Sequence, residues 1–152
     1  MSHNIIIRTG EDRDADALVS FNIAMAYETE QTELQLQTVS SGVKSLLNHP
    51  GHGFYIVAEV DVEVVGSLMV TNEWSDWRNG FFWWIQSVYV DPKYRRRGIY
   101  KRLYDHIKSM AAEQGNICGF RLYVERDNTV AQNTYASLGM KETYYKIYEE
   151  TL

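Results

Sequence analysis

The stretch "VYVDPKYRRRGIYKRLYDHI", Val88–Ile107, decides how this chain is organised. It starts as an apolar strand, passes through a turn rich in arginine, and continues with apolar residues at helical spacing. Upstream, Phe81–Val90 is apolar nearly throughout, as expected of a strand that is covered on both faces near the centre of a sheet. Downstream, Cys118–Glu125 returns to a strand pattern. The sequence therefore predicts a strand–loop–helix–strand crossover with parallel strands at Ile85 and Leu122.

The remaining segments predict a mixed sheet whose first half is mainly antiparallel. We expect strands and helices in the order β-α-α-β-β-β-α-β-α-β, an α/β fold. The expected elements are a strand at Ile5–Arg8, a helix at 14–25 behind Asp12 or Asp14 as N-cap, a helix at 34–48, a hairpin at 53–74 with its turn at Asp61–Glu63, a turn at 75–80 ("SDWRNG"), a helix capped by Asp127 or Asn128 and stopped by Gly139, and a strand at Tyr144–Tyr148.

Composition limits the classes of function that fit this chain. Its 152 residues suit one domain, 1–152, without a linker or repeat. A formal charge of -5 argues against general nucleic-acid binding, and no apolar run approaches the ~20 residues of a membrane span. With no secretory leader pattern and a single cysteine, Cys118, we expect a cytoplasmic protein. We interpret Cys118 as a structural residue at the buried start of a strand, and the pair His49 and His52 as too few ligands for a metal site.

Six of the fifteen Lys and Arg residues lie between Lys93 and Arg102, and three uses are open to them. They could form a nucleic-acid patch, a solvated helix face, or a cradle for one phosphorylated ligand. Arg95–Gly98 precedes the helix, where free N–H groups and the helix dipole favour a pyrophosphate. Lys101 and Arg102 suit a solvated helix surface. Because neither G-x-x-x-x-G-K-[ST] nor G-x-G-x-x-G is present, a phosphorylated carrier other than ATP or a dinucleotide is favoured.

Two motifs in this order resemble those of the GNAT N-acetyltransferase superfamily. The first, [QR]-x-x-G-x-[GA] after a strand ending in V-x-P, matches at Arg95 and Gly98. The second, N-x-x-A-x-x-x-Y-x-x-x-G-[FM], matches at Asn128, Ala131, Tyr135, Gly139 and Met140. The resemblance implies the acyl-CoA N-acyltransferase fold, with two parallel central strands that splay apart. It also implies acetyl-CoA as co-substrate, without a metal, and direct acetyl transfer to an amine.

The resemblance implies roles for particular residues. Tyr135 is the expected acid that protonates the departing thiolate. The residues expected to bind the cofactor are Val88, Tyr89, Val90, Arg95, Arg96, Arg97, Gly98, Ile99, Tyr100, Asn128, Ala131 and Tyr135. Tyr100 departs from the motif, which usually has glycine or alanine there. Its ring could pack against the carrier or point into the core.

The general base is the least defined role. Many relatives carry a glutamate on the strand before the loop, whereas this chain has Trp84 and Gln86, which cannot accept a proton. Glu28 and Glu73 are candidate bases acting through water. Carboxylates and aromatic rings suit a cationic amine, so we expect a small, polyamine-like acceptor. The candidate contacts are Glu28 and Glu30 after the first helix, and Trp74, Asp76, Trp77 and Trp84 in or near the turn after the hairpin.

Two further hypotheses remain open. The missing strand glutamate would fit a non-catalytic acyl-CoA sensor, and the arginines would fit a nucleic-acid-binding domain, although the net charge argues against the latter. A homodimer is a third expectation, because a terminal strand with exposed aromatic residues offers an edge for pairing.

Overall fold

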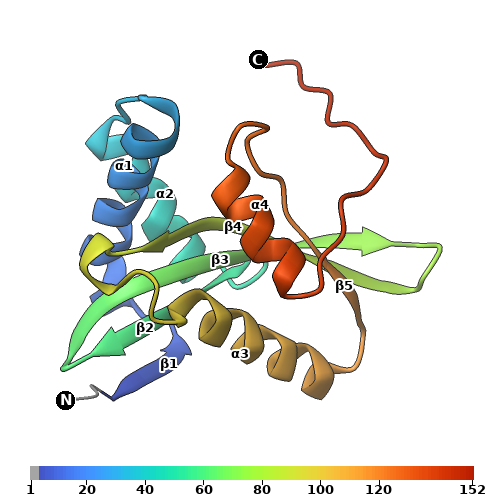
Figure 1. The fold of residues 1–152 in the computed structure, drawn as a ribbon, viewed down its shortest axis with the longest axis horizontal. Helices are drawn as coiled ribbons and strands as arrows, with labels where there is room; N and C mark the ends of the chain where they lie inside the picture. Colours follow the sequence, from blue (N-terminus) through green and yellow to red (C-terminus); the bar gives the residue numbers. More distant parts are fainter. Residues whose placement is uncertain (1–3) are drawn as a thin grey trace. The chain divides into compact units, whose positions relative to one another are not determined.

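The computed structural model describes residues 4–152, which form two compact units (Figure 1). The first unit ends at Leu122 and holds the sheet with three helices, and the second, Tyr123–Leu152, holds one helix. The elements are β1 (Ile5–Thr9), α1 (Ala15–Glu30), α2 (Leu36–Asn48), β2 (Phe54–Val60), β3 (Glu63–Ser75), β4 (Gly80–Val90), α3 (Ile99–Gln114), β5 (Ile117–Arg121) and α4 (Thr129–Ser137), with short 3₁₀ helices at Asp12–Asp14 and Pro92–Tyr94.

The sheet is mixed, as predicted, and its strands lie in the order β1-β2-β3-β4-β5. β1 to β4 are antiparallel neighbours, while β4 and β5 run parallel. Their parallel pairing ends at Trp84 and Arg121, one residue short of the predicted pair Ile85 and Leu122. The prediction that β4 lies near the centre is confirmed, because β4 is next to the middle strand, β3, and pairs with a strand on each side.

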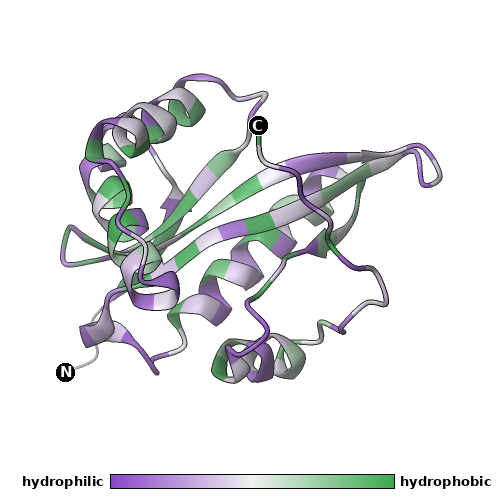
Figure 2. Cartoon of the chain, turned by 90° about the horizontal axis from the view of Figure 1, so that it is seen from above, coloured by the Kyte–Doolittle hydropathy of each residue, from purple (hydrophilic) through white to green (hydrophobic). Residues whose placement is uncertain are grey.

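Helices cover both faces of the sheet (Figure 2). Tyr55 and Val57 of β2 pack in one cluster with apolar residues of α1 and α2. α3 lies over the opposite face, where it contacts β1, β2, β3 and β5. Ile56, Val57 and Ala58 are fully buried in succession, which is possible only for a strand covered on both sides.

Local sequence explains most element boundaries. Asp61 and Val62 both have positive φ, 50° and 70°, and form the two-residue turn between β2 and β3. α2 ends at Asn48, before Pro50. The predicted helix cap at Asp12 or Asp14 does not form through a side-chain hydrogen bond at the start of α1. The Asp14 carboxylate instead accepts hydrogen bonds from Arg8 and from the Glu11 N–H.

The predicted closing strand at Tyr144–Tyr148 is wrong. The segment has no regular structure, and Tyr144 and Tyr148 are 94% and 92% exposed. Aromatic and β-branched residues favour strands only where a partner strand and a half-buried surface exist, and this segment pairs with no strand among residues 4–152. The preceding helix agrees with prediction, since the Asn128 side chain caps α4 and Gly139 follows its end with φ +100°. No helix within the described range is long and apolar enough to cross a bilayer.

Candidate functional site

The loop between β4 and α3 exposes the start of a helix. Arg96 and Gly98 both adopt left-handed backbone conformations, with φ of +63° and +76°. The first hydrogen bond of α3 runs from the Arg102 N–H to the Gly98 carbonyl, so the amides of the first turn face out of the helix end. A Cβ on Gly98 would meet no atom within 4 Å. Glycine is therefore favoured here by its backbone conformation, and the space beside the helix start is open.

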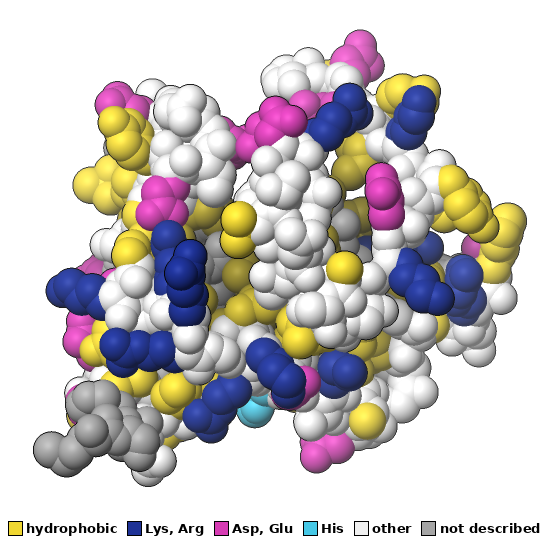
Figure 3. Space-filling model, viewed as in Figure 1, with side chains coloured by type: hydrophobic (Ala, Val, Ile, Leu, Met, Phe, Trp, Pro, Cys, Tyr) yellow, Lys and Arg dark blue, Asp and Glu magenta, His cyan; other side chains and the backbone are white. Residues whose placement is uncertain are grey.

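Basic side chains gather around this loop, but the structure gives them different partners (Figure 3). Arg95 forms an ion pair with Glu28, at 2.9 Å. Arg97 lies over the Tyr94 ring, 5.3 Å from its centroid. Arg96 is exposed and pairs with no carboxylate among the described residues. Of the loop arginines, Arg96 and Arg97 thus keep their charge uncompensated by a carboxylate.

The two basic residues inside α3 behave as parts of the helix surface. Lys101 forms an exposed ion pair with Asp105 at 2.7 Å, one helical turn away. Arg102 donates a hydrogen bond to the Ile5 carbonyl at 3.0 Å, which ties α3 to β1. Neither side chain belongs to the loop.

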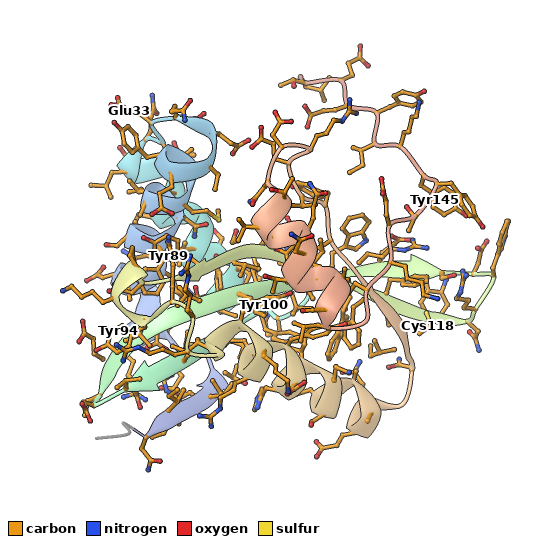
Figure 4. All side chains as sticks on the ribbon, viewed as in Figure 1. Glu33, Tyr89, Tyr94, Tyr100, Cys118 and Tyr145 are labelled. Carbon is orange, nitrogen blue, oxygen red and sulfur yellow. The ribbon has the colours of Figure 1, made fainter. Side chains whose placement is uncertain are left out.

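Arg95 is fixed from three sides. Its Nε donates to the Val90 carbonyl at 2.8 Å, and its Nη2 donates to both carboxylate oxygens of Glu28, at 2.9 and 3.2 Å. Its guanidinium also lies over the ring of Tyr89, 5.3 Å from the centroid. Burial, with the nearby Glu28 charge adding to it, raises the pKa of Tyr89 above its usual value. Figure 4 labels Tyr89 at the end of β4 and Tyr94 in the loop.

The last part of β4 has an open edge. β5 pairs with β4 only as far as Trp84, so the segment 85–90 has no β5 partner. A bulge interrupts the β3 pairing between Ser67 and Met69, opposite Ser87, whose φ is +51°. This edge of the segment thus has no β5 strand to pair with, as expected if the two parallel strands splay apart.

Tyr100 belongs to a row of aromatic rings. It stacks on Tyr104 with ring centroids 6.2 Å apart, and Tyr104 in turn meets Phe120 edge-on at 5.6 Å. Phe120 continues the row to Trp83 of β4. Of the two predicted orientations, this arrangement favours the one in which the Tyr100 ring points into the core. Tyr100 is labelled in Figure 4.

Glu73 lies in strand β3, within the segment predicted as a hairpin, and the turn that follows this strand spans 76–79. The Trp84 indole N–H donates to its Oε1 at 2.6 Å, and Nη1 of Arg121 donates to both oxygens, at 2.8 and 3.1 Å. The Arg121 guanidinium stacks on Phe82, 3.7 Å from the ring centroid. Arg121 was not predicted, although the parallel register that pairs it with Trp84 is the signal that could have found it.

The other predicted acceptor contacts do not form one cluster. Trp74, 54% exposed, lies near the end of β3, and Trp77, 89% exposed, lies with Asp76 in the turn between β3 and β4. Glu28 and Glu30 lie in the last turn of α1, and not after the helix as predicted.

The length of β4 separates these two groups. Glu28 reaches the Val90 end of β4 through Arg95, whereas Trp77 lies next to its Gly80 end. Ten residue steps of about 3.3 Å make this separation roughly 33 Å. Trp84 and Glu73 lie between the two ends.

Three predicted residues belong to the second unit. The Asn128 side chain accepts a hydrogen bond from the Ala131 N–H at 3.1 Å, so both residues build the start of α4. Tyr135 is half-buried in the same helix, and burial raises the pKa of its phenol. The phenol therefore remains protonated at neutral pH.

Cys118 is not buried, contrary to prediction. It lies in β5 with its side chain exposed, and its Sγ donates to the Phe81 carbonyl at 3.1 Å (Figure 4). His49 and His52 stack on each other with centroids 5.2 Å apart. Residues 4–152 contain no group of three or more His, Cys, Asp or Glu side chains placed to hold a metal ion.

Comparisons with known proteins match the fold described above. The Acetyltransferase (GNAT) family matches residues 15–140. A possible acetyltransferase from Clostridium difficile 630 is 47% identical, with 97% of each chain covered and a TM-score of 0.91. Aminoglycoside N-acetyltransferase AAC(6')-Iy in complex with CoA is 15% identical, covering 99% of this chain and 97% of its own, with a TM-score of 0.79.

A predicted acetyltransferase from Clostridium acetobutylicum, solved with acetyl-CoA, is 17% identical with a TM-score of 0.79 and covers 97% of this chain and 96% of its own. At this identity, and at that of the aminoglycoside enzyme, the likeness shows the fold alone. A search of curated proteins returned no match.

Proposed function

Because the chain belongs to the GNAT acetyltransferase family, we propose that it transfers an acetyl group from acetyl-CoA directly to a primary amine of a small molecule. The observation that carries this proposal is that two features suited to CoA follow each other directly along the chain. The open edge of β4 at 85–90 leads directly into a loop that exposes the N-terminus of α3. An extended pantetheine arm suits the former, and a pyrophosphate suits the latter.

Acetyl transfer requires three movements of electrons and protons. The amine nitrogen attacks the thioester carbonyl, so that a C–N bond forms while the C–S bond breaks. The amine loses a proton, and the departing thiolate gains one. We propose that the Tyr135 hydroxyl donates the proton that the thiolate gains. The matched motif supports this role, and the raised pKa of Tyr135 keeps its hydroxyl protonated at neutral pH.

Glu73 is the better supported of the two predicted bases. Its Oε1 accepts hydrogen bonds from both Trp84 and Arg121, but its Oε2 accepts only one, from Arg121, and so keeps capacity for a water that could relay the amine proton. Both Glu28 oxygens likewise accept hydrogen bonds from an arginine, Arg95, but this contact holds Glu28 beside the loop between β4 and α3 and not beside the middle of β4. The change Glu73→Gln should lower kcat and leave the Kd for CoA unchanged. If that Kd shifts while kcat is preserved, Glu73 is not the base.

The expectation of a polyamine-like acceptor now rests on fewer residues. Glu28 and Trp77 lie at opposite ends of β4, so one small molecule cannot contact both. Glu73 and Trp84 remain as an acidic and aromatic pair that could receive an amine. We therefore propose a small primary amine and treat the polyamine as one member of that class.

Thiol release from acetyl-CoA, measured against panels of polyamines, amino acids, aminoglycosides and peptides, tests the proposal. We expect turnover with at least one small amine. Tight binding of CoA without turnover on any panel would favour the second candidate, a non-catalytic acyl-CoA sensor. The observation that favours this candidate is the engagement of both predicted base carboxylates by arginines, at 2.8 and 2.9 Å.

A further inference from the structure

We infer that Glu28 and Arg95 together act as a strut that positions the loop between β4 and α3, and that neither is a catalytic base or a direct phosphate ligand. This inference rests on the proposed use of CoA. It assigns the phosphate contacts of this loop to Arg96, Arg97 and the backbone amides of the helix start.

α1 meets the end of β4 at two points on one helical stripe. Phe21 contacts the Tyr89 ring with centroids 5.1 Å apart, and Glu28 holds Arg95. Phe21 and Glu28 are seven residues apart, which is two helical turns, so both project from the same side of α1. The aromatic contact and the ion pair therefore act from one surface.

The Arg95 side chain completes this contact from the other direction. Its guanidinium lies over the Tyr89 ring and donates to the Val90 carbonyl. A closed path thus runs from α1 through Tyr89 to Arg95 and back to α1 through Glu28. Arg95 is the first residue after the 3₁₀ helix, so fixing it sets where the left-handed turn at Arg96 begins.

The hydrogen-bonding capacity of Arg95 explains why it suits a strut better than a ligand. A guanidinium binds phosphate best with a planar pair of N–H groups, but here Nη2 faces the two Glu28 oxygens and Nε faces the Val90 carbonyl. Its charge is already matched by Glu28. Arg96, without such a partner in the described chain, keeps both its charge and its donors for a ligand.

The sign of one binding change decides between the two roles. If Arg95 is a strut, Glu28→Gln loosens the loop and weakens CoA binding. If Arg95 is a phosphate ligand for which Glu28 competes, the same change releases it and strengthens binding. If Glu28 is a base, CoA binding stays the same and only kcat falls. Because the ion pair is about 40% exposed, we expect the Kd to rise about two- to fivefold.

The experiment is calorimetric titration of CoA into the full chain, which needs no acceptor amine. Variants are Glu28→Gln, Arg95→Gln and the double variant, with Glu33→Gln as the matched control because Glu33 is an exposed carboxylate beyond the end of α1 (Figure 4). We expect the double variant to bind CoA about as weakly as either single variant, since each change breaks the same strut. Glu33→Gln should leave the Kd unchanged.

The outcomes separate this inference from the proposed function. An unchanged or lower Kd in Glu28→Gln overturns the strut, as does a double variant whose loss equals the sum of the two single losses. Arg96→Ala should weaken CoA binding and reduce its dependence on salt, whereas Glu28→Gln should keep the salt dependence. Failure of the unaltered chain to bind CoA at all would instead overturn the proposed function.

Discussion

Single residues in this chain carry charges whose surroundings determine their role. Glu28 and Glu73 have the same side chain and both pair with an arginine, yet one lies at a helix end and the other in the middle of a sheet. The sequence predicted both as candidate bases because nothing local distinguishes them. Their partners, Arg95 and Arg121, are distant in sequence and become neighbours only through strand register and helix packing.

Tyr135 provides a prediction about pH. Because burial raises its pKa above the usual value of about 10, the phenol stays protonated across the range in which the enzyme is assayed. We expect kcat to show no alkaline decline from this group up to pH 9. Tyr135→Phe should lower kcat by about 10²-fold or more, as for loss of a general acid, with little change in the KM for acetyl-CoA. Steady-state kinetics across pH would check this, and an unchanged kcat in Tyr135→Phe would contradict it.

Asp14 provides a prediction about stability. Burial alone would raise the pKa of its carboxyl, but hydrogen bonds from Arg8 and from the Glu11 N–H outweigh this effect and lower the pKa below its usual value. A carboxyl whose pKa is lower in the folded state stabilises the fold above its unfolded pKa, near 4, and this stability is lost as pH falls through the folded pKa.

The change Asp14→Asn should therefore cost about 1–3 kcal/mol of unfolding free energy at pH 7, because a buried hydrogen-bond network loses its charged acceptor. The difference from the unaltered chain should shrink as the pH falls below 4. Urea unfolding at pH 7 and at lower pH values measures it. A difference that is constant with pH would show that the pKa of Asp14 is not lowered.

At the scale of elements, hydrophobic periodicity predicted the strands and helices of the first unit well. Glycine and proline marked the ends of α2 and α3 for physical reasons that are visible in the sequence. Two features could not be predicted from such patterns. The bulge at Ser87 depends on how β3 and β4 align, and the strand at Tyr144–Tyr148 failed to form because strand propensity does not supply a partner.

α3 offers a matched pair of glycines for testing its two ends. Gly98 precedes the helix with φ +76° and Gly115 follows it with φ +82°, and a Cβ on either would meet no atom within 4 Å. Alanine at each position should therefore cost a similar backbone strain, about 1 kcal/mol. Thermal unfolding should show comparable losses for Gly98→Ala and Gly115→Ala.

Only the Gly98 change should affect the cofactor. Its Cβ would project into the open space beside the helix start, where we propose that the pyrophosphate lies. We expect CoA to bind less tightly to Gly98→Ala by about tenfold, the equivalent of about 1.4 kcal/mol, and as tightly as before to Gly115→Ala. Equal CoA affinities in the two variants would place the pyrophosphate elsewhere.

At the scale of the molecule, the apolar core is concentrated in the first unit. All hydrophobic residues that are buried in the structure lie between Ala15 and Ala111, and α4 contains no buried residue. The sequence did not predict this division, because α4 shows an apolar stripe at Ala131, Tyr135 and Leu138 like that of any packed helix. Periodicity reports which face is apolar but not how completely it is covered.

This distribution predicts unequal local stability. Amides that open only when the core separates should exchange with the free energy of global unfolding, whereas a helix without buried residues can open alone at lower cost. We expect peptides from β2 and α3 to be strongly protected in hydrogen exchange of the ligand-free chain, and peptides from α4 to exchange at least tenfold faster. Peptide-level mass spectrometry at pH 7 measures the exchange of β2, α3 and α4 separately. The exposed segment 144–148 provides an internal reference for unprotected exchange. Protection of α4 equal to that of β2 would mean that both units unfold in one cooperative step.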